Sequence, residues 1–246
     1  MTRFKAFLIH FGISVAIFVV LAWLIVFVWY PQPFFAHDGG WQGIRIAALV
    51  DLVLGPGLTL IVFKAGKPGL KFDLTMIALA QTAALTWGVW TIHDQRTAMV
   101  VYADGAFYTL SGGQVAEAGD QAPEVLARSS ERPAYAFVRL PEDPKELRGL
   151  RMTGLAGVPL YKMVERFEPL DGSTLGEVLA KSLDIEARAL DHARLRDEFE
   201  RLLASRQTTA ETLAFVPLHC RYKSLILVLQ RADGRVVGAI DVNPKT

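Results

Sequence analysis

The chain has 246 residues, a formal net charge of +1 and a hydrophobic content of 52%. This length accommodates one membrane unit and one further domain of roughly 150 residues. The balanced charge, without a basic patch interleaved with aromatic residues, excludes a nucleic-acid partner. The single cysteine, Cys220, excludes an internal disulfide, so the C-terminal domain must fold on core packing alone unless Cys220 joins two chains.

Three apolar stretches lie in the first 93 residues, at 6–30, 44–63 and 74–92. Each is about as long as a bilayer-spanning helix, which needs roughly 20 residues. Each is apolar on all faces, whereas a helix on the surface of a soluble core is apolar along one stripe. The first stretch is too long for a signal-peptide core and lacks a small-residue cleavage site at its end, so it is expected to be a retained anchor. The sequence therefore predicts three transmembrane helices.

Basic residues around these stretches predict their direction, because Lys and Arg favour the cytoplasmic side of a span. They precede the first stretch and separate the second from the third, at positions Arg3, Lys5, Lys64, Lys67 and Lys71. The loop 31–43 contains neither Lys nor Arg, and aromatic residues that include Trp41 gather in it, as is typical of an outer interface. The N-terminus is therefore expected in the cytoplasm and residues 94–246 on the outer side.

The C-terminal domain, residues 94–246, begins and ends with a hairpin pattern. Residues 97–110 place two β-prone runs around Asp104-Gly105, the signal for a type I′ turn. Residues 213–230 predict one or two strands, and Asp233-Gly234 predicts the turn before a returning strand at 236–242. Weaker patterns between the hairpins predict a loop with a short helix at 111–130, a strand at 134–140 and a short helix that starts at Pro144.

Residues 174–206 predict one long amphipathic helix. Thr174 and Glu177 match a capping box, and an apolar stripe follows with charges on the other faces. A break near Asp184 would divide the helix in two. Strands, then a helix, then strands indicate an α+β domain in which antiparallel hairpins carry the helix on one face. The expected architecture is a three-helix membrane domain at 1–93 followed by an extracytoplasmic α+β domain at 94–246.

Asp51 is the one acidic residue inside an apolar stretch, and an ionisable group at such a depth is a functional candidate. It is expected to pair with Arg45, to accept a hydrogen bond from a neighbouring helix, or to contact a partner. A proton or ion path is a further interpretation, although a transporter normally needs more spans. Gly55-Pro56-Gly57 predicts a kink or a close helix crossing. Gln81 and Thr82 are suited to hydrogen bonds across helices at the same depth.

No motif for catalysis or for a cofactor is present. The sequence lacks a Gly-rich phosphate loop, HExxH, GxSxG and CxxC. His37-Asp38 offers two metal ligands without a third. His219 and Cys220 are neighbours on an expected strand and point to opposite faces, which argues against a nucleophilic pair. The sequence therefore predicts a non-catalytic protein that needs no metal.

Several strings of the first 93 residues carry a family resemblance. In chain order they are residues 3–10 (RFKAFLIH), 29–31 (WYP), 34–35 (FF), 39–41 (GGW), 51–56 (DLVLGP), 64–68 (KAGKP) and 71–73 (KFD). With these strings the chain resembles the type IV pilin accessory proteins of the TfpX/TfpZ group, which are small inner-membrane proteins. The resemblance covers the membrane domain and, more loosely, the C-terminal hairpins.

The resemblance implies a non-enzymatic role in type IV pilus biogenesis, at the bacterial inner membrane and with a periplasmic C-terminal domain. The implied partners are the major pilin, the membrane lipid and other proteins of the pilus assembly platform. The candidate partner-binding residues are Asp51, Gly55, Pro56, Trp41 and Gln81. The alternative is a membrane-anchored sensor with a periplasmic ligand-binding domain, against which the short cytoplasmic segments leave no room for an output domain.

Overall fold

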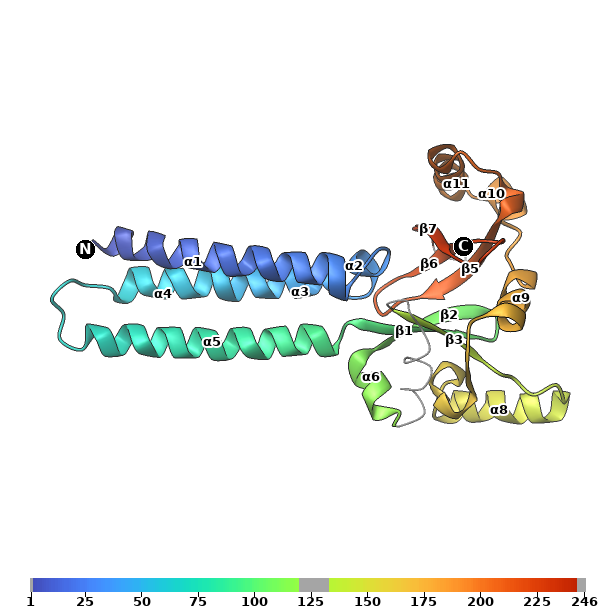
Figure 1. Ribbon diagram of the computed structural model, residues 1–246, viewed down its shortest axis with the longest axis horizontal. Helices are drawn as coiled ribbons and strands as arrows, with labels where there is room; N and C mark the ends of the chain where they lie inside the picture. Colours follow the sequence, from blue (N-terminus) through green and yellow to red (C-terminus); the bar gives the residue numbers. More distant parts are fainter. Residues whose placement is uncertain (1, 120–132, 243–246) are drawn as a thin grey trace. The chain divides into compact units, whose positions relative to one another are not determined.

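The computed structural model describes residues 2–119 and 133–242. The chain divides into two compact units, Met1–Arg96 and Thr97–Thr246. The first is helical and is called here the three-helix unit. The second is built on a β-sheet with short helices around it and is called the sheet unit (Figure 1).

Three long helices form the three-helix unit. The first runs through α1 (Arg3–Trp23) and the π-helical segment η1 (Leu24–Trp29). The second follows the short helix α2 (Phe34–His37) and runs through α3 (Gly40–Ala48), the π-helical segment η2 (Leu49–Leu54) and α4 (Gly55–Val62). The third is α5 (Leu70–Asp94). Within the described residues these are the three helices long and apolar enough to cross a bilayer, as the sequence predicts.

Local signals set the ends of these helices, and apolar contacts bring them together. The hydroxyl of Thr2 caps α1 by accepting a hydrogen bond from the backbone N–H of Lys5 at 3.2 Å. Within the unit, α1 packs along α4, and α5 lies against α3 and α4 (Figure 1). At one end Ile25, Tyr30 and Ile92 form a buried cluster, in which the Tyr30 hydroxyl donates to the carbonyl of Ile92 at 3.2 Å.

In the described part of the sheet unit, seven strands form one sheet. They are β1 (Thr97–Ala103), β2 (Ala106–Ser111), β3 (Ala134–Val138), β4 (Phe167–Pro169), β5 (Leu213–His219), β6 (Ser224–Gln230) and β7 (Val236–Ile240), in the order β4-β3-β1-β2-β5-β6-β7. β1 pairs with β3, and β2 with β5, in parallel. The expectation of antiparallel hairpins alone is therefore wrong, because the helices between β2 and β5 supply the long crossovers that parallel neighbours require.

Both predicted hairpins are confirmed. β1 and β2 pair up to Ala103 opposite Ala106, and both turn residues have positive φ, +49° at Asp104 and +94° at Gly105, as a type I′ turn requires. β6 and β7 pair across the turn that contains Gly234, whose φ is +72°. The strand expected at 134–140 is β3, whereas the three-residue strand β4 has no counterpart in the sequence prediction.

Helices of the sheet unit lie between the strands in sequence. They are α6 (Gly112–Glu117), α8 (Pro144–Ala156), α9 (Gly172–Ala180), α10 (Ile185–Asp191) and α11 (Ala193–Arg206), with 3₁₀ turns at Leu160–Lys162, Val164–Arg166 and Ala210–Thr212. The short helices expected after residue 111 and from Pro144 are present as α6 and α8. The loop predicted around α6 falls partly outside the described residues.

The single helix expected at 174–206 is wrong, because three helices occupy this segment and its preceding turn. The alternative of a break near Asp184 is confirmed, since α9 ends at Ala180 and α10 begins at Ile185. The backbone N–H of Leu183 donates to the carbonyl of Phe215 at 2.7 Å, and the N–H of Phe215 donates to the Ser182 hydroxyl at 2.9 Å. These bonds to β5 hold the chain out of the helix, and Asp184 then caps α10. The capping box also starts earlier than expected, at Asp171 with Thr174 as its third helical residue.

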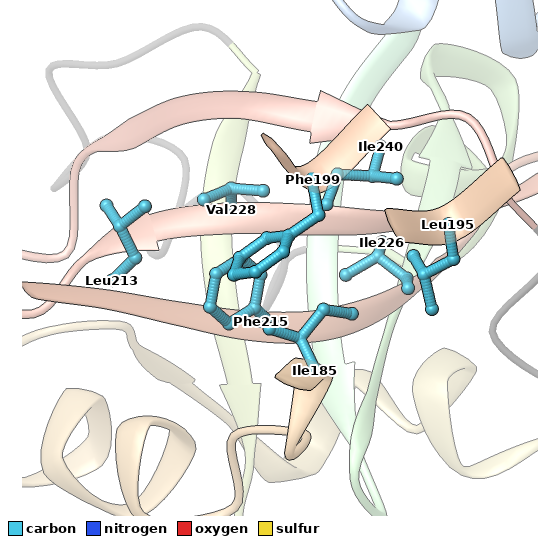
Figure 2. Close-up of a cluster of buried hydrophobic side chains, with 8 residues drawn as sticks. All are labelled: Ile185, Leu195, Phe199, Leu213, Phe215, Ile226, Val228 and Ile240. Carbon is cyan, nitrogen blue, oxygen red and sulfur yellow. The ribbon is translucent and has the colours of Figure 1, made fainter. Parts of the chain in front are cut away.

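Two hydrophobic clusters of the sheet unit lie within the described residues. In one, Val115 of α6 packs on residues of β1, β2 and β3 that include Met99 and Val138. In the other, α10 and α11 pack on β5, β6 and β7, and Figure 2 shows the rings of Phe199 and Phe215 meeting at its centre; the residues are Ile185, Leu195, Phe199, Leu213, Phe215, Ile226, Val228 and Ile240. β6 is buried at five successive residues, 225–229, so the sheet is covered on both faces there.

Candidate functional site

Polar side chains recur at a spacing of four residues on two helices of the three-helix unit. α1 carries His10 and Ser14, and the second helix carries Asp51 and Thr59 with Gly55 between them. Residues i and i+4 share one face of a helix, so each helix presents a polar stripe. Ser14, Asp51 and Thr59 are all buried. The stripes therefore face the interior of the unit.

Asp51 joins all three helices. It lies in η2 and is 1% exposed. The hydroxyl of Ser14 donates to Oδ1 of Asp51 at 3.1 Å, and the amide of Gln81 donates to the same oxygen at 2.7 Å. Arg45 is engaged elsewhere, with its guanidinium carbon 4.9 Å from the centre of the Trp41 ring. Asp51 thus accepts hydrogen bonds from the two neighbouring helices, one of the alternatives expected from the sequence.

Gln81 and His10 extend this network along the helices. Nε2 of His10 lies 2.8 Å from Oε1 of Gln81, and Nδ1 lies 2.6 Å from the hydroxyl of Thr59. The Gln81 amide gives its N–H to Asp51, so its oxygen is left to accept the proton on Nε2. In that tautomer Nδ1 accepts the single proton of the Thr59 hydroxyl, for which the carbonyl of Gly55 at 3.2 Å is the competing acceptor. A continuous chain of hydrogen bonds then runs from Thr59 through His10 and Gln81 to Asp51.

Gly55 of the second helix lies directly against the side chain of Gln81 of α5. A Cβ placed on Gly55 would overlap the side-chain amide of Gln81, whereas one placed on Gly57 would meet nothing within 4 Å. Pro56 is buried next to Gly55 at the start of α4, directly after the π-helical segment. A π-segment and a proline each disturb the regular ladder of backbone hydrogen bonds. The Gly55-Pro56 pair therefore combines an irregular backbone with space for the Gln81 side chain.

The network holds one unused acceptor. Oδ2 of Asp51 is buried and has no hydrogen-bond partner within residues 2–119 and 133–242. Leaving a buried acceptor without a donor costs on the order of 1–3 kcal/mol, and natural proteins keep few such groups. The three-helix unit therefore has the capacity to accept one further hydrogen bond at Asp51.

Of the residues proposed from the sequence, Asp51, Gly55 and Gln81 meet in this network, and Pro56 adjoins it. Trp41 lies outside it and is 46% exposed, with the Phe35 ring at its edge. Thr82 is on the exposed face of α5. Ser14 and Thr59 belong to the network, although neither was predicted from the sequence. The available signal was spacing, because Ser14 follows His10 by four residues and Thr59 follows Gly55 by four. Single hydroxyl residues are common in apolar helices, so this spacing alone does not predict a site.

Comparison with known proteins places the chain in a family. The model of the family described as "Fimbrial assembly protein FimB" matches residues 1–39. The "Fimbrial assembly protein, serogroup E1" of Dichelobacter nodosus is 27% identical over 207 residues, which cover 83% of this chain and 77% of that protein. The "Fimbrial assembly protein, serogroups C1 and C2" of the same organism is 33% identical over 110 residues, 44% of this chain and 83% of that protein. No solved structure matches the chain.

The two relatives support the family in complementary ways, one by the length of the similarity and one by its identity. The similarity to the serogroup E1 protein is long enough to extend through parts of both units. The strings that resemble type IV pilin accessory proteins begin within residues 1–39, where the family model matches. The chain therefore belongs to the fimbrial assembly protein family, a family of type IV pilus accessory proteins.

Proposed function

We propose that this protein is a non-catalytic accessory factor of type IV pilus biogenesis that binds the major pilin in the bacterial inner membrane and promotes its assembly. The observation that carries the proposal is the similarity to fimbrial assembly proteins over 83% of the chain. The three apolar helices support a membrane location for this activity. The proposal includes three transmembrane spans, a cytoplasmic N-terminus and a periplasmic sheet unit, as the distribution of Lys and Arg indicates.

Pilin is the proposed partner because the three-helix unit offers apolar surface of the right kind. A pilin before assembly is held in the membrane by one hydrophobic helix. α5 buries only Ile92 among the described residues and exposes large side chains that include Phe72, Leu79 and Trp87. An apolar helix packs on such a surface through van der Waals contacts and polar side chains. We assign α5 as the helix that contacts the pilin helix.

The proposed roles of the candidate residues follow from their positions. Asp51, Gly55, Pro56 and Gln81 are internal, so they set the angle and spacing at which α5 is presented. The unused Oδ2 of Asp51 is the acceptor for a donor on the pilin helix, reached when the helices separate. Trp41 is exposed beside Arg45 and is the proposed contact near the outer interface.

Two experiments test the proposal. First, deletion of the gene should lower the level of pilin and the number of surface pili, and the wild-type gene should restore both. Second, a photo-crosslinking residue at Leu79 or Trp87, which are 59% and 69% exposed, should capture pilin in cells. The same probe at Ile25, which is 0% exposed, is the matched control and should capture none. Unchanged piliation in the deletion strain would refute the proposal.

The membrane orientation has its own test. Alkaline phosphatase is active only in the periplasm, so a fusion after residue 242 should be active and a fusion within the Lys-rich loop 64–69 should be inactive. Green fluorescent protein at the same two points should give the opposite pattern. Activity of both phosphatase fusions, or of neither, would contradict the orientation while leaving the pilus role standing.

A further inference from the structure

The helix α8 contributes least to the core of the sheet unit. All 13 residues of α8, Pro144–Ala156, are described, and none of them is buried. The other described helices of the unit, α6, α9, α10 and α11, each bury at least one apolar side chain. On its inner side α8 is held where the Arg151 guanidinium donates to Oδ2 of Asp104 at 3.0 Å and where Gly154 lies against Leu160. The opposite face of α8 is open to solvent.

A stripe of side chains runs along this open face. Its members follow one another at spacings of three, four and three residues, which places them on one side of a helix, and they are Lys145, Arg148, Met152 and Leu155. Met152 and Leu155 are large apolar side chains that are 65% and 84% exposed, and Val158 beyond the helix is 53% exposed. A single exposed apolar residue is ordinary, whereas several that adjoin indicate a contact surface.

The apolar end of the stripe leads into a pocket of about 370 Å³, lined by α8, the turn between β1 and β2, and the 3₁₀ turn that follows α8. Leu155 lines the pocket together with Tyr108 and Tyr161, whose stacked rings have centroids 4.4 Å apart and planes that differ by 6°. The ion pair of Asp104 with Arg151 supplies the charged part of the lining. Ligand pockets span about 300–1,000 Å³, so this small pocket suits an inserted side chain rather than a large cofactor.

The surface around the pocket is basic. From the start of α8 to the end of the following 3₁₀ turn, the charged residues are the single acid Glu146 and the bases Lys145, Arg148, Arg151 and Lys162. Asp143, in front of the helix, uses its carboxylate to accept hydrogen bonds from the first backbone N–H groups of α8. Lys145 and Arg148 form no ion pair within residues 2–119 and 133–242. Their charges are therefore available to the carboxylates of a partner.

We propose that the open face of α8 and the adjoining pocket form the docking surface of the sheet unit for the part of pilin that lies outside the membrane. The inference rests on the proposed function and names the contact that the sheet unit makes. The segment that fits this surface carries a large apolar side chain for the pocket, with carboxylates beside it for Lys145 and Arg148.

The exposed apolar rim favours a protein as the occupant. A small molecule in the pocket would leave Met152 and Val158 in water, whereas a protein covers both and excludes water around the inserted side chain. A bilayer surface is a poorer fit, because the pocket is concave and receives a protruding group.

Photo-crosslinking in cells tests the surface with the full-length chain. A crosslinking residue at Leu155 should capture pilin, whereas the same residue at Leu190 of α10, a leucine that is 77% exposed in the same unit, should capture little. A probe at Leu79 of α5 runs in parallel and reports on the proposed function. Capture at Leu155 but not at Leu190 supports the proposal.

The remaining outcomes separate the two proposals. Capture at Leu79 together with equal capture at Leu155 and Leu190, or with none at either, overturns the docking surface and leaves the proposed function standing. Phospholipid captured at Leu155 in place of pilin also overturns the docking surface, because the face then binds the membrane. No capture at any of the three positions refutes the proposed function and this inference with it.

Charge reversal tests the basic end of the stripe without a crosslinker. Arg148→Glu should lower the recovery of pilin with the full-length protein roughly fivefold, because it sets a carboxylate against those of the partner. Arg196→Glu, at an exposed arginine of α11, is the matched control and should leave the recovery unchanged. Both side chains are exposed, so both variants should keep the wild-type midpoint in urea unfolding. Equal recovery of pilin by the two variants would overturn the proposal.

Discussion

Gln81 uses one amide group to connect three helices. Its N–H donates to Asp51, and its oxygen lies 2.8 Å from Nε2 of His10. Inside an apolar unit the alternative to these bonds is an unsatisfied polar group, yet measured hydrogen bonds between membrane helices contribute only about 0.6 kcal/mol on average and about 1.7 at most. The network therefore contributes more through the geometry it imposes than through its total energy.

Gln81→Leu should lower the stability of the three-helix unit by about 1–3 kcal/mol, because it removes the interhelical hydrogen bonds of the Gln81 amide and leaves Asp51 and His10 with fewer partners. Unfolding by sodium dodecyl sulfate in mixed micelles measures the change. Thr82→Val is the matched control on the exposed face of the same helix and should have no measurable effect. Equal losses in both variants would show that the network does not hold the helices together.

Gly55→Ala should destabilise the unit to a similar extent, because the new methyl group displaces the Gln81 amide from Asp51 and His10. Gly57→Ala, which meets nothing within 4 Å, should be neutral or slightly stabilising. The two changes at Gly55 and Gln81 break the same contacts, so their combination should cost less than the sum of the single costs. Strictly additive costs in the double variant would contradict this explanation.

The stability of the sheet unit is expected to depend on alkaline pH through Tyr102. Burial, together with the charges of Asp104 and Glu177, raises the pKa of Tyr102 to about 12. The phenol titrates near 10 in the unfolded chain, so its contribution to stability is complete below pH 10 and is lost as the pH rises through about 12. At pH 11 the loss amounts to about 1.4 kcal/mol.

Tyr102→Phe should remove this alkaline loss, measured as the difference between variant and wild type in urea unfolding at pH 9 and pH 11. The hydroxyl of Tyr102 is buried without a hydrogen-bond partner among the described residues, so the variant should be as stable as the wild type, or more so, at neutral pH. Tyr222→Phe, at a residue that is 54% exposed, should leave the alkaline loss in place. A large destabilisation of Tyr102→Phe at pH 7 would mean that the hydroxyl has a partner.

At the scale of the elements, features that depend on residues close in sequence could be predicted. Features that depend on contacts between distant residues could not. The turn at Asp104-Gly105 and the helix start at Pro144 depend on residues close in sequence, and both were predictable. A break near Asp184 was predicted as an alternative, but the hydrogen bonds between residues 182–183 and Phe215 that hold it join residues far apart in sequence and could not be predicted. The same holds for the parallel pairing of β1 with β3, and for the contact of Gln81 with Gly55 across two helices.

Substitution of Asp184 tests how far the local N-cap, as opposed to the bonds of residues 182–183 to β5, determines the start of α10. Its carboxylate accepts a hydrogen bond from the N–H of Ala187 at 3.0 Å and so starts α10. Asp184→Ala should cost about 1 kcal/mol in the unfolding of the sheet unit, the usual effect of removing an N-cap. Asp184→Asn keeps an acceptor and should retain most of the stability. If alanine is tolerated without cost, then the bonds of residues 182–183 to β5 suffice to start the helix.

The whole molecule combines two compact units, and the proposed function uses both. A pilin held by α5 in the membrane would also offer its head to the sheet unit on the outer side. Two weak contacts in one complex reinforce each other, because the second forms at a high effective concentration and can raise the apparent affinity by about 10²–10⁴. Under the proposed function the sheet unit, the larger of the two, supplies the second contact.

A truncated variant that ends at residue 96 tests the contact through α5 without the contact through the sheet unit. The three-helix unit keeps its network in this variant, since the residues from His10 to Gln81 all remain. The variant should accumulate in the membrane but recover at least tenfold less pilin per molecule in co-purification. The full-length chain with Leu79→Ala is the complementary variant, in which the membrane contact alone is weakened. Undiminished recovery by the shortened chain would assign pilin binding to the helices alone.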